Sequence, residues 1–205
     1  MNHTSLIRQA LEHFQIPVQD IIIDRLETFI NELSRWNKKI NLVGLKDRDQ
    51  VCRELLADAF FLHAFIRGIK VLVDIGSGSG ILGFPLSVLN ESMMVFSVDS
   101  NLKKIQFQRH ICRTLGADNF KPVHGRIESI DPLGADGMIC KAYGKLGAIF
   151  MASDRHLLPG GTVIMPKGKN EDAIYYNGYT LERNSLYSLP GVTKEFRLLV
   201  YKKIS

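Results

Sequence analysis

The sequence predicts an α/β fold in which a doubly wound, mostly parallel sheet of seven strands follows a helical segment. From residue 68 onward, short aliphatic runs alternate with helical segments, a pattern typical of βαβ units and of a parallel sheet with helices on both faces. Residues 1–67 instead carry apolar side chains at helical spacing. We therefore expect residues 1–67 to form an N-terminal helical cap and residues 68–205 to form the sheet domain.

Three amphipathic helices are predicted in the N-terminal part. The first has Thr4 or Ser5 as its N-cap, the second has Asp20, and the third follows a loop at residues 37–44. Apolar stripes of this kind are typical of core-facing helices, so we expect packing rather than ligand binding. The stripes comprise Leu6, Ile7, Leu11 and Phe14, then Ile22, Leu26, Phe29, Ile30, Leu33 and Trp36, then Leu55, Leu56, Ala59, Leu62, His63 and Ile66.

Seven strands are predicted after this part. Five short aliphatic runs suit buried parallel strands, and two longer runs near the C-terminus are expected to close one edge in antiparallel fashion. Three helices, at about 80–90, 101–115 and 145–157, separate the parallel strands. The strand runs are 70–75, 93–98, 120–123, 137–140, 162–165, 179–186 and 195–203.

Composition narrows the class of protein. The chain has 205 residues, of which 45% are hydrophobic and 23% charged, and this excludes a wholly disordered or collagen-like chain. Cys52, Cys112 and Cys140 are too scattered for a disulfide framework or a metal site, which indicates reduced thiols in a cytoplasmic protein. No signal peptide and no membrane-spanning run is seen. The net charge of +5 permits a nucleic-acid partner without requiring one.

The first strand ends in a glycine-rich loop, VDIGSGSGILGFPL. Gly76, Gly78 and Gly80 allow a tight turn and a close approach of a ligand to the backbone, although a plain strand-to-helix turn has the same pattern. A dinucleotide site prefers glycine where Ile81 stands.

Asp74 precedes this loop by two residues. A carboxylate there repels a pyrophosphate and attracts S-adenosylmethionine, whose net charge is positive. One charge pair at about 4 Å amounts to roughly 4 kcal/mol at an effective dielectric of 20, enough to decide between the two ligands. A turn or capping role is the alternative for Asp74.

Further candidates follow the second and third strands. Asp99 ends the second strand, where an acidic residue accepts the ribose hydroxyls of an adenosine in both cofactor classes; it can also cap the next helix. After the third strand, Ile127 offers an apolar surface to an adenine ring. Lys141 and Lys167, after the fourth and fifth strands, are candidates for positioning the substrate, with solvated lysines as the alternative.

Together these motifs resemble the rRNA small subunit methyltransferase G family, also called glucose-inhibited division protein B. The resemblance runs from about Trp36 to Lys203 and rests on WNKKINL, VDIGSGSG with GFPL, Asp99, GRIES, CKAYGKL and PKGK. It implies a class I, Rossmann-like enzyme that uses S-adenosylmethionine to methylate N7 of a guanine in the 530 loop of 16S rRNA. It also implies that Gly76, Ile81, Ile127, Glu128 and Lys141 bind the cofactor.

Four positions depart from the family pattern. The family's His-x-Leu-Asp segment stands here as Glu54 to Ala57, its Pro-Gly after the loop is Leu82-Gly83, and its arginine is Lys141, which keeps the charge without the bidentate fork. The cofactor motifs are therefore better preserved than the substrate motifs.

Methylation of guanine N7 requires no general base, because N7 already carries an in-plane lone pair. We therefore assign no proton-transfer residue, and we expect an rRNA or small-subunit partner and a monomer. Three alternatives stay open: a methyltransferase of another RNA or a small molecule, a non-catalytic RNA-binding assembly factor, and a nicotinamide-dependent oxidoreductase. The candidate phosphate-binding surface comprises Lys38, Lys39, Lys46, Arg48, Lys103, Lys104, Arg109, Arg113, Lys167 and Lys169.

Overall fold

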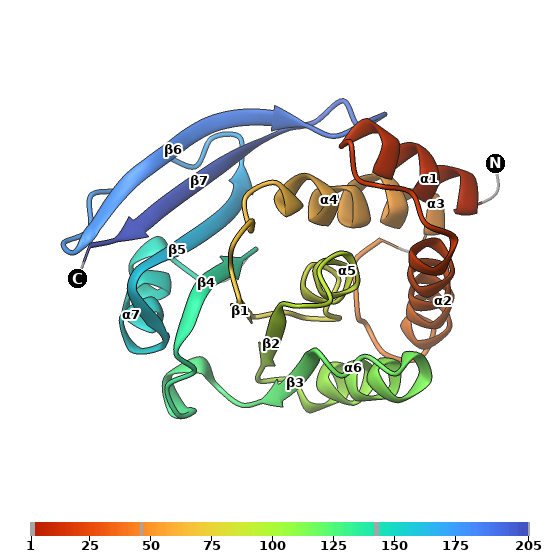
Figure 1. Ribbon diagram of the computed structural model, residues 1–205, viewed down its shortest axis with the longest axis horizontal. Coiled ribbons are helices and arrows are strands. Elements are labelled where there is room, and N and C mark those ends of the chain that lie inside the picture. The colour runs from red at the N-terminus through yellow and green to blue at the C-terminus, as the bar shows by residue number, and fades with distance from the viewer. Residues whose placement is uncertain (1–2, 46, 142–143, 205) are drawn as a thin grey trace.

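A computed structural model describes residues 3–45, 47–141 and 144–204, and its centre is one seven-stranded sheet (Figure 1). The strand order is β3-β2-β1-β4-β5-β7-β6. The first five strands pair in parallel, and β7 pairs antiparallel with both β5 and β6. The predicted fold class and the antiparallel edge are confirmed. The strands are β1 (Val71–Ile75), β2 (Met94–Asp99), β3 (Phe120–His124), β4 (Ala135–Cys140), β5 (Leu157–Gly168), β6 (Tyr179–Ser188) and β7 (Glu195–Lys203).

The register brings the carboxyl ends of the central strands together. Ile75 at the end of β1 pairs with Val98 of β2 and with Cys140 of β4. The segments that follow these three residues therefore lie along one edge of the sheet, where ligands bind in doubly wound folds.

The helices match the predicted ones in number and place, but two of the predicted caps are wrong. Thr4 lies inside α1, where its hydroxyl donates to Glu27, and Asp20 is the first helical residue of α2 after the N-cap position Gln19. Asn101 caps α6 by accepting from two backbone amides. The helices are α1 (His3–His13), α2 (Asp20–Asn37), α4 (Ala57–His63), α5 (Gly83–Leu89), α6 (Leu102–Leu115) and α7 (Leu146–His156).

The third predicted helix is not one regular helix. A single turn, α3 (Arg48–Gln50), leads into a π-helix, η1 (Val51–Leu56), and only then into α4. A π-helix bonds residue i to i+5 and thus holds about one residue more per turn than an α-helix. It therefore shifts the residues that follow it by one position relative to a regular helix.

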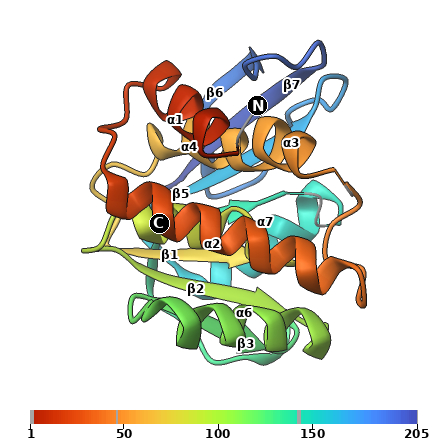
Figure 2. The same ribbon diagram turned by 90° about the vertical axis from the view of Figure 1, so that its right-hand side faces the viewer.

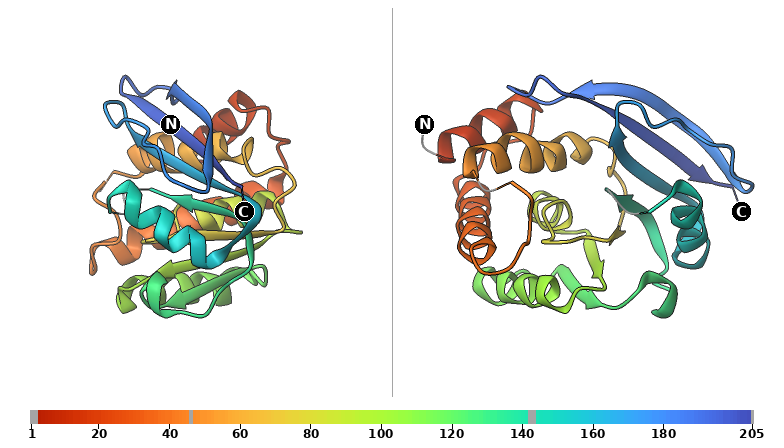
Figure 3. Two further views of the ribbon diagram at one scale, coloured as in Figure 1. Left: turned by 90° about the vertical axis from the view of Figure 1, so that its left-hand side faces the viewer. Right: turned by 180° about the vertical axis from the view of Figure 1, so that it is seen from behind.

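Helices cover both faces of the sheet (Figures 1 and 3). On one face α5 and α6 lie next to the sheet, and α2 packs outside them, with Phe29 stacked on Phe84 at 4.7 Å (Figure 2). On the other face α7 contributes the buried Phe150. Residues of α1, α2 and α4 belong to the same hydrophobic core as β1 and β2, so the N-terminal helices share a core with the sheet. The division of the chain at residue 67 stays a prediction.

No helix among the described residues is long and apolar enough to span a bilayer.

Candidate cofactor and substrate site

The segments beyond β1, β2 and β3 enclose a cavity of about 600 Å³, the Asp99 pocket. Gly76, Asp99, Ile127 and Glu128 line it, so four predicted cofactor residues from three separate segments meet in one place. Ile127 is the first residue of η2 (Ile127–Ser129). Its side chain is buried and forms an aliphatic part of the pocket wall. The other lining residues are Ile75, Val98, Ser100, Gly125, Arg126 and Ser129.

Asp99 fixes the glycine loop to the end of β2. Its Oδ2 accepts from the Gly78 amide at 2.8 Å, and its Oδ1 accepts from the Asn101 amide at 2.7 Å. A carboxylate has about four acceptor sites, so both oxygens keep capacity for ribose hydroxyls. On the loop's other side the buried Gln108 amide donates to Ser77 Oγ at 2.9 Å and to Gly78 O at 2.8 Å. The loop is held rigid before any ligand binds.

The loop glycines have conformations that other residues avoid. Gly76, Gly78 and Gly80 have φ of 62°, 61° and 75°. A Cβ at Gly80 would also lie 3.0 Å from Phe120 Cζ, whereas a Cβ at Gly78 meets only the flexible Lys104 Nζ at 3.9 Å.

Alanine substitutions separate these two effects. Gly80→Ala is expected to lower the free energy of unfolding by about 3 kcal/mol, because backbone strain and overpacking add, and Gly78→Ala by about 1 kcal/mol from backbone strain alone. Chemical denaturation of both variants measures the difference. Equal losses would contradict the close contact with Phe120.

Asp74 lies beneath the loop. Only 2% of the residue is exposed, and its Oδ2 accepts from the Gly83 amide at 3.1 Å. Burial raises the pKa of this carboxyl to about 7, the Gly83 amide opposes that rise, and Asp99 adds to it. Asp74 therefore carries only part of a negative charge at neutral pH. Its place beside Ile81 on the wall of a second cavity is compatible with the predicted role toward a cationic cofactor, which stays a prediction.

Lys141 lies at the end of β4 in a chain of polar contacts. Its Nζ donates to Asp58 Oδ2 at 2.7 Å, and Tyr187 OH donates to Asp58 Oδ1 at 2.6 Å. The Asp58 side chain is 0% exposed, while that of Lys141 is 27% exposed. A buried carboxylate thus holds the lysine ammonium at the mouth of the site. Burial, with Asp58 next in importance, raises the pKa of Tyr187, so its hydroxyl stays a proton donor.

Sequence reasoning missed Asp58 and Tyr187. The family pattern places an aspartate at position 57, where this chain has alanine. Asp58 directly follows that position, in the first turn of α4. The signal that was available is this acidic residue next to Ala57; the π-helix that precedes α4 cannot be read from apolar spacing.

Three separate cavities are neighbours, each sharing one lining residue with the next. The Asp99 pocket shares Gly76 with a cavity of about 220 Å³, the Asp74 pocket, and this shares Lys141 with a cavity of about 150 Å³, the Lys167 pocket. The two predicted substrate-positioning lysines, Lys141 and Lys167, therefore line one pocket. Lys167 is buried, and its Nζ lies 3.6 Å from Glu171 Oε2.

The donor set fits S-adenosylmethionine. The Asp99 pocket offers carboxylate acceptors and an aliphatic wall for an adenosine, and the Asp74 pocket lies beside it at the level of the glycine loop. Ser79 lines the Asp74 pocket, and its buried hydroxyl has no hydrogen-bond partner among the residues that the structure describes. A polar ligand in this cavity would satisfy that hydroxyl.

The residues of the predicted phosphate-binding surface differ in their exposure to solvent. Arg48 and Lys104 are half-buried, Lys167 is buried, and Lys46 lies outside the described residues. Six members of the predicted set are exposed: Lys38, Lys39, Lys103, Arg109, Arg113 and Lys169. Ala142 and Tyr143 of the motif after β4 also lie outside the described residues.

The fold and this site define a class I S-adenosylmethionine-dependent methyltransferase. Solved chains of similar fold include TrmN from Thermus thermophilus, with a TM-score of 0.56 and 18% identity over 71% of this chain and 49% of that one. TYW2 from M. jannaschii in complex with AdoMet has a TM-score of 0.55 and 15% identity over 73% of this chain and 74% of that one. At such identities the likeness shows the fold alone.

Comparisons of the sequence identify the family of this chain. The profile of rRNA small subunit methyltransferase G (GidB) matches residues 22–194, and the chain belongs to this family. Ribosomal RNA small subunit methyltransferase G of Neisseria gonorrhoeae (strain NCCP11945) is 28% identical over 207 residues, covering 99% of this chain and 100% of the relative. Its namesake from Azoarcus sp. (strain BH72) is 32% identical over 180 residues, covering 86% and 85%. The predicted family and its cofactor, S-adenosylmethionine, are confirmed, and the nicotinamide alternative is set aside.

Proposed function

We propose that this protein transfers the methyl group of S-adenosylmethionine to N7 of a guanine in the 530 loop of 16S rRNA. The observation that carries the proposal is the junction of the Asp74 and Lys167 pockets at Lys141. S-adenosylmethionine held by the residues of the glycine loop would supply the methyl group, and Lys141 would contact a base bound in the Lys167 pocket.

The cofactor residues have distinct roles in this proposal. Asp99 accepts hydrogen bonds from the ribose hydroxyls, Ile127 packs against the adenine ring, and Glu128 lies near the adenosine part of the cofactor. The backbone of Gly76, Gly78 and Gly80 gives the cofactor a close approach, and Ile81 contacts it from the Asp74 pocket. Asp74 beneath the loop favours the positive charge of the donor.

The reaction requires that the guanine base be positioned, and it does not require a residue that transfers a proton. Guanine presents O6 and N7 as adjacent acceptors, so a lysine ammonium that donates to O6 also orients N7. Lys141, held by Asp58, is placed to make this contact, and Lys167 supplies a second cation in the same pocket. Because N7 attacks through its lone pair, the methyl–sulfur bond breaks as the nitrogen–methyl bond forms, and no proton has to leave first.

Labelled S-adenosylmethionine tests the proposal. The protein is incubated with small ribosomal subunits that lack the modification, with naked 16S rRNA and with small-molecule acceptors, and the methylated nucleotide is mapped. Label at a guanine N7 in the 530 loop is the expected result. Label at another nucleotide or on a small acceptor favours one of the other methyltransferase activities, and binding without transfer favours an assembly factor.

We expect binding to rRNA to depend strongly on salt. If the exposed lysines and arginines contact phosphates together, the association constant falls by at least about tenfold between about 50 and about 200 mM salt, because condensed counterions are released. Filter binding across a salt series measures the slope, and an unchanged constant would remove the phosphate contacts from the proposal.

We further propose that the protein acts in the cytoplasm as a monomer. Light scattering measures its oligomeric state.

A further inference from the structure

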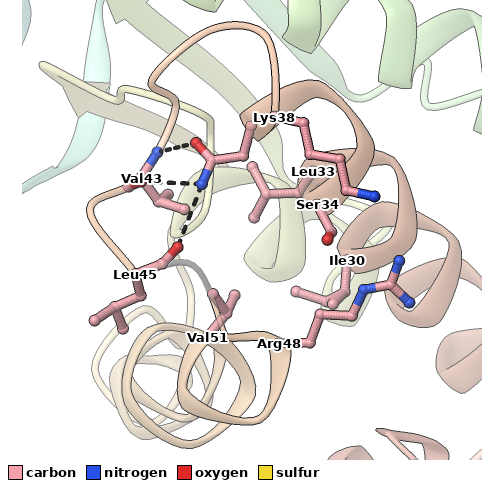
Figure 4. A pocket seen from close by; sticks show the side chains of 9 residues that line it. Ile30, Leu33, Ser34, Lys38, Val43, Leu45, Arg48 and Val51 are labelled. Carbon is pink, nitrogen blue, oxygen red and sulfur yellow. Dashed lines mark hydrogen bonds between the residues drawn. The ribbon is translucent and has the colours of Figure 1, made fainter.

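A fourth cavity lies outside the series described above, between α2, the loop at residues 38–45 and α3 (Figure 4). We call it the Ser34 pocket. Its volume is about 410 Å³, within the range of small-ligand sites, and most of its wall is aliphatic, as in such sites. The aliphatic residues are Ile30, Leu33, Val43, Leu45 and Val51.

The polar groups of the Ser34 pocket favour an anion. Lys38 and Arg48 extend from two sides of the pocket, with Ser34 between them (Figure 4). Arg48 donates to the neutral Asn31 Oδ1 at 2.9 Å, and in the described part of the chain neither cation forms an ion pair with a carboxylate. Asp47 and Asp49 flank Arg48, but Asp47 accepts from backbone amides of α3 and Asp49 lies 3.0 Å from His3 Nδ1. The Lys38 and Arg48 side chains are therefore the charged groups that line the pocket, and cations suit a phosphate group.

The wall of the Ser34 pocket is preorganised. Asn37 Nδ2 donates to Val43 O at 3.1 Å and to Leu45 O at 3.3 Å, and Asn37 Oδ1 accepts from the amides of Leu42 at 2.7 Å and Val43 at 3.1 Å. One side chain thus fixes the loop from inside. A fixed wall lowers the entropy cost of binding a ligand against it.

The same loop borders the methyl-transfer site. Val43 lines both the Ser34 pocket and the Asp74 pocket, and its neighbours Leu42 and Gly44 line the Asp74 pocket. The loop is therefore a shared wall. Lys141 also lines the Asp74 pocket, so this loop separates Lys141 from the Ser34 pocket.

We propose that the Ser34 pocket binds a nucleotide of the RNA substrate that neighbours the target guanine. Its base lies among the aliphatic side chains, with the Ser34 hydroxyl as a hydrogen-bond partner, and its phosphate lies between Lys38 and Arg48. Proteins that read single-stranded RNA commonly hold unstacked bases in this way. The identity of the RNA rests on the proposed function, whereas the chemistry of the pocket does not.

Photo-crosslinking tests the proposal directly. A 16S rRNA fragment carrying 4-thiouridine beside the target guanine is crosslinked to the protein, and the attached peptide is identified. The expected peptide falls within residues 30–51. Ser34→Trp, which fills the pocket, is expected to abolish this crosslink, and thermal unfolding verifies that the variant is folded. Crosslinks confined to other peptides would overturn the proposal.

Kinetics provide a second test that does not depend on Ser34→Trp folding. Lys38→Ala and Arg48→Ala are each expected to raise KM for the RNA by about tenfold, the effect of one lost charge-assisted contact, without changing kcat or the cofactor Kd. Arg35→Ala is the matched control: it also removes one positive charge, from α2, but Arg35 does not line the pocket, and its side chain is 64% exposed and pairs with Glu32 at 2.6 Å. Equal KM values for all three variants would overturn the proposal.

The outcomes separate this inference from the proposed function. If the wild-type protein crosslinks through residues 30–51 but methylates no guanine in the 530 loop, the proposed function fails and the nucleotide pocket stands. If a guanine in the 530 loop is methylated but the crosslink lies outside residues 30–51, the proposed function stands and the nucleotide pocket fails. If guanosine monophosphate saturates the pocket while the KM for RNA stays the same in its presence, the pocket belongs to a free nucleotide and the RNA proposal fails.

Discussion

Asp58→Asn is expected to lower kcat/KM for rRNA by about 100-fold, with a much smaller rise in the cofactor Kd, because Lys141 also lines the Asp74 pocket. Asp58 is fully buried and holds Lys141 Nζ at 2.7 Å, so its charge fixes where the ammonium points. An asparagine of the same shape still accepts from Tyr187 but no longer attracts the lysine. Misplacement of a positioning group by about 1 Å is enough for a loss of this size. Steady-state kinetics with rRNA and calorimetry with the cofactor measure the two effects.

A double-mutant cycle shows whether Asp58 acts through Lys141. In a Lys141→Ala background, Asp58→Asn is expected to have little further effect on kcat, because the group it positions is gone. Additive losses would show instead that Asp58 acts independently of Lys141, and the positioning role would fail. Tyr187→Phe is the control: it removes the 2.6 Å hydrogen bond to the other carboxylate oxygen and leaves the Lys141 contact in place. Lys141→Arg, which restores the residue typical of the family, is expected to retain activity.

The cofactor side of the site could be predicted because it depends on local patterns. A glycine-rich turn after an apolar strand and an acid at the next strand end are each readable within a few residues. The sheet then brings Gly76, Asp99 and Ile127 together, because parallel strands end at one edge.

The substrate side could not be predicted in the same way, because its contacts span the chain. Asp58 and Tyr187 are 129 positions apart, and neither belongs to a motif. The π-helix before α4 also interrupts the regular helical spacing from which the position of Asp58 would be inferred. The burial of Asp74 could not be predicted either. From its position in the sequence Asp74 is expected at the mouth of the loop, but in the structure it is buried beneath the loop. The residue types at a site follow from sequence, whereas their burial, and with it the charge of Asp74 at neutral pH, follows from packing.

Asp74→Asn is expected to weaken cofactor binding and to stabilise the fold at the same pH. Burial raises the pKa of Asp74 from 3.8 to about 7 in the folded protein. Between these values the folded state binds one proton more than the unfolded state, so the free energy of unfolding falls as pH rises from about 4 to about 7. Asparagine does not ionise, and above pH 7 the variant is expected to be more stable than wild type by on the order of 4 kcal/mol.

Binding has the opposite dependence on pH. A cationic cofactor prefers the ionised carboxylate, so wild-type affinity is expected to be constant above the Asp74 pKa of about 7 and to fall as pH drops below it. For Asp74→Asn the affinity at pH 8 is expected to be at least about fivefold lower, the equivalent of about 1 kcal/mol, and independent of pH near neutrality. Calorimetry and urea unfolding of both proteins at pH 5 and pH 8 measure the two effects. The difference in stability has its own internal control, since it must shrink as the pH falls from about 7 toward the unfolded pKa of 3.8, below which Asp74 becomes protonated in both states. A variant that loses stability at pH 8, or binds the cofactor as wild type does, would show that the buried carboxylate serves the loop through Gly83 rather than the charge of the methyl donor.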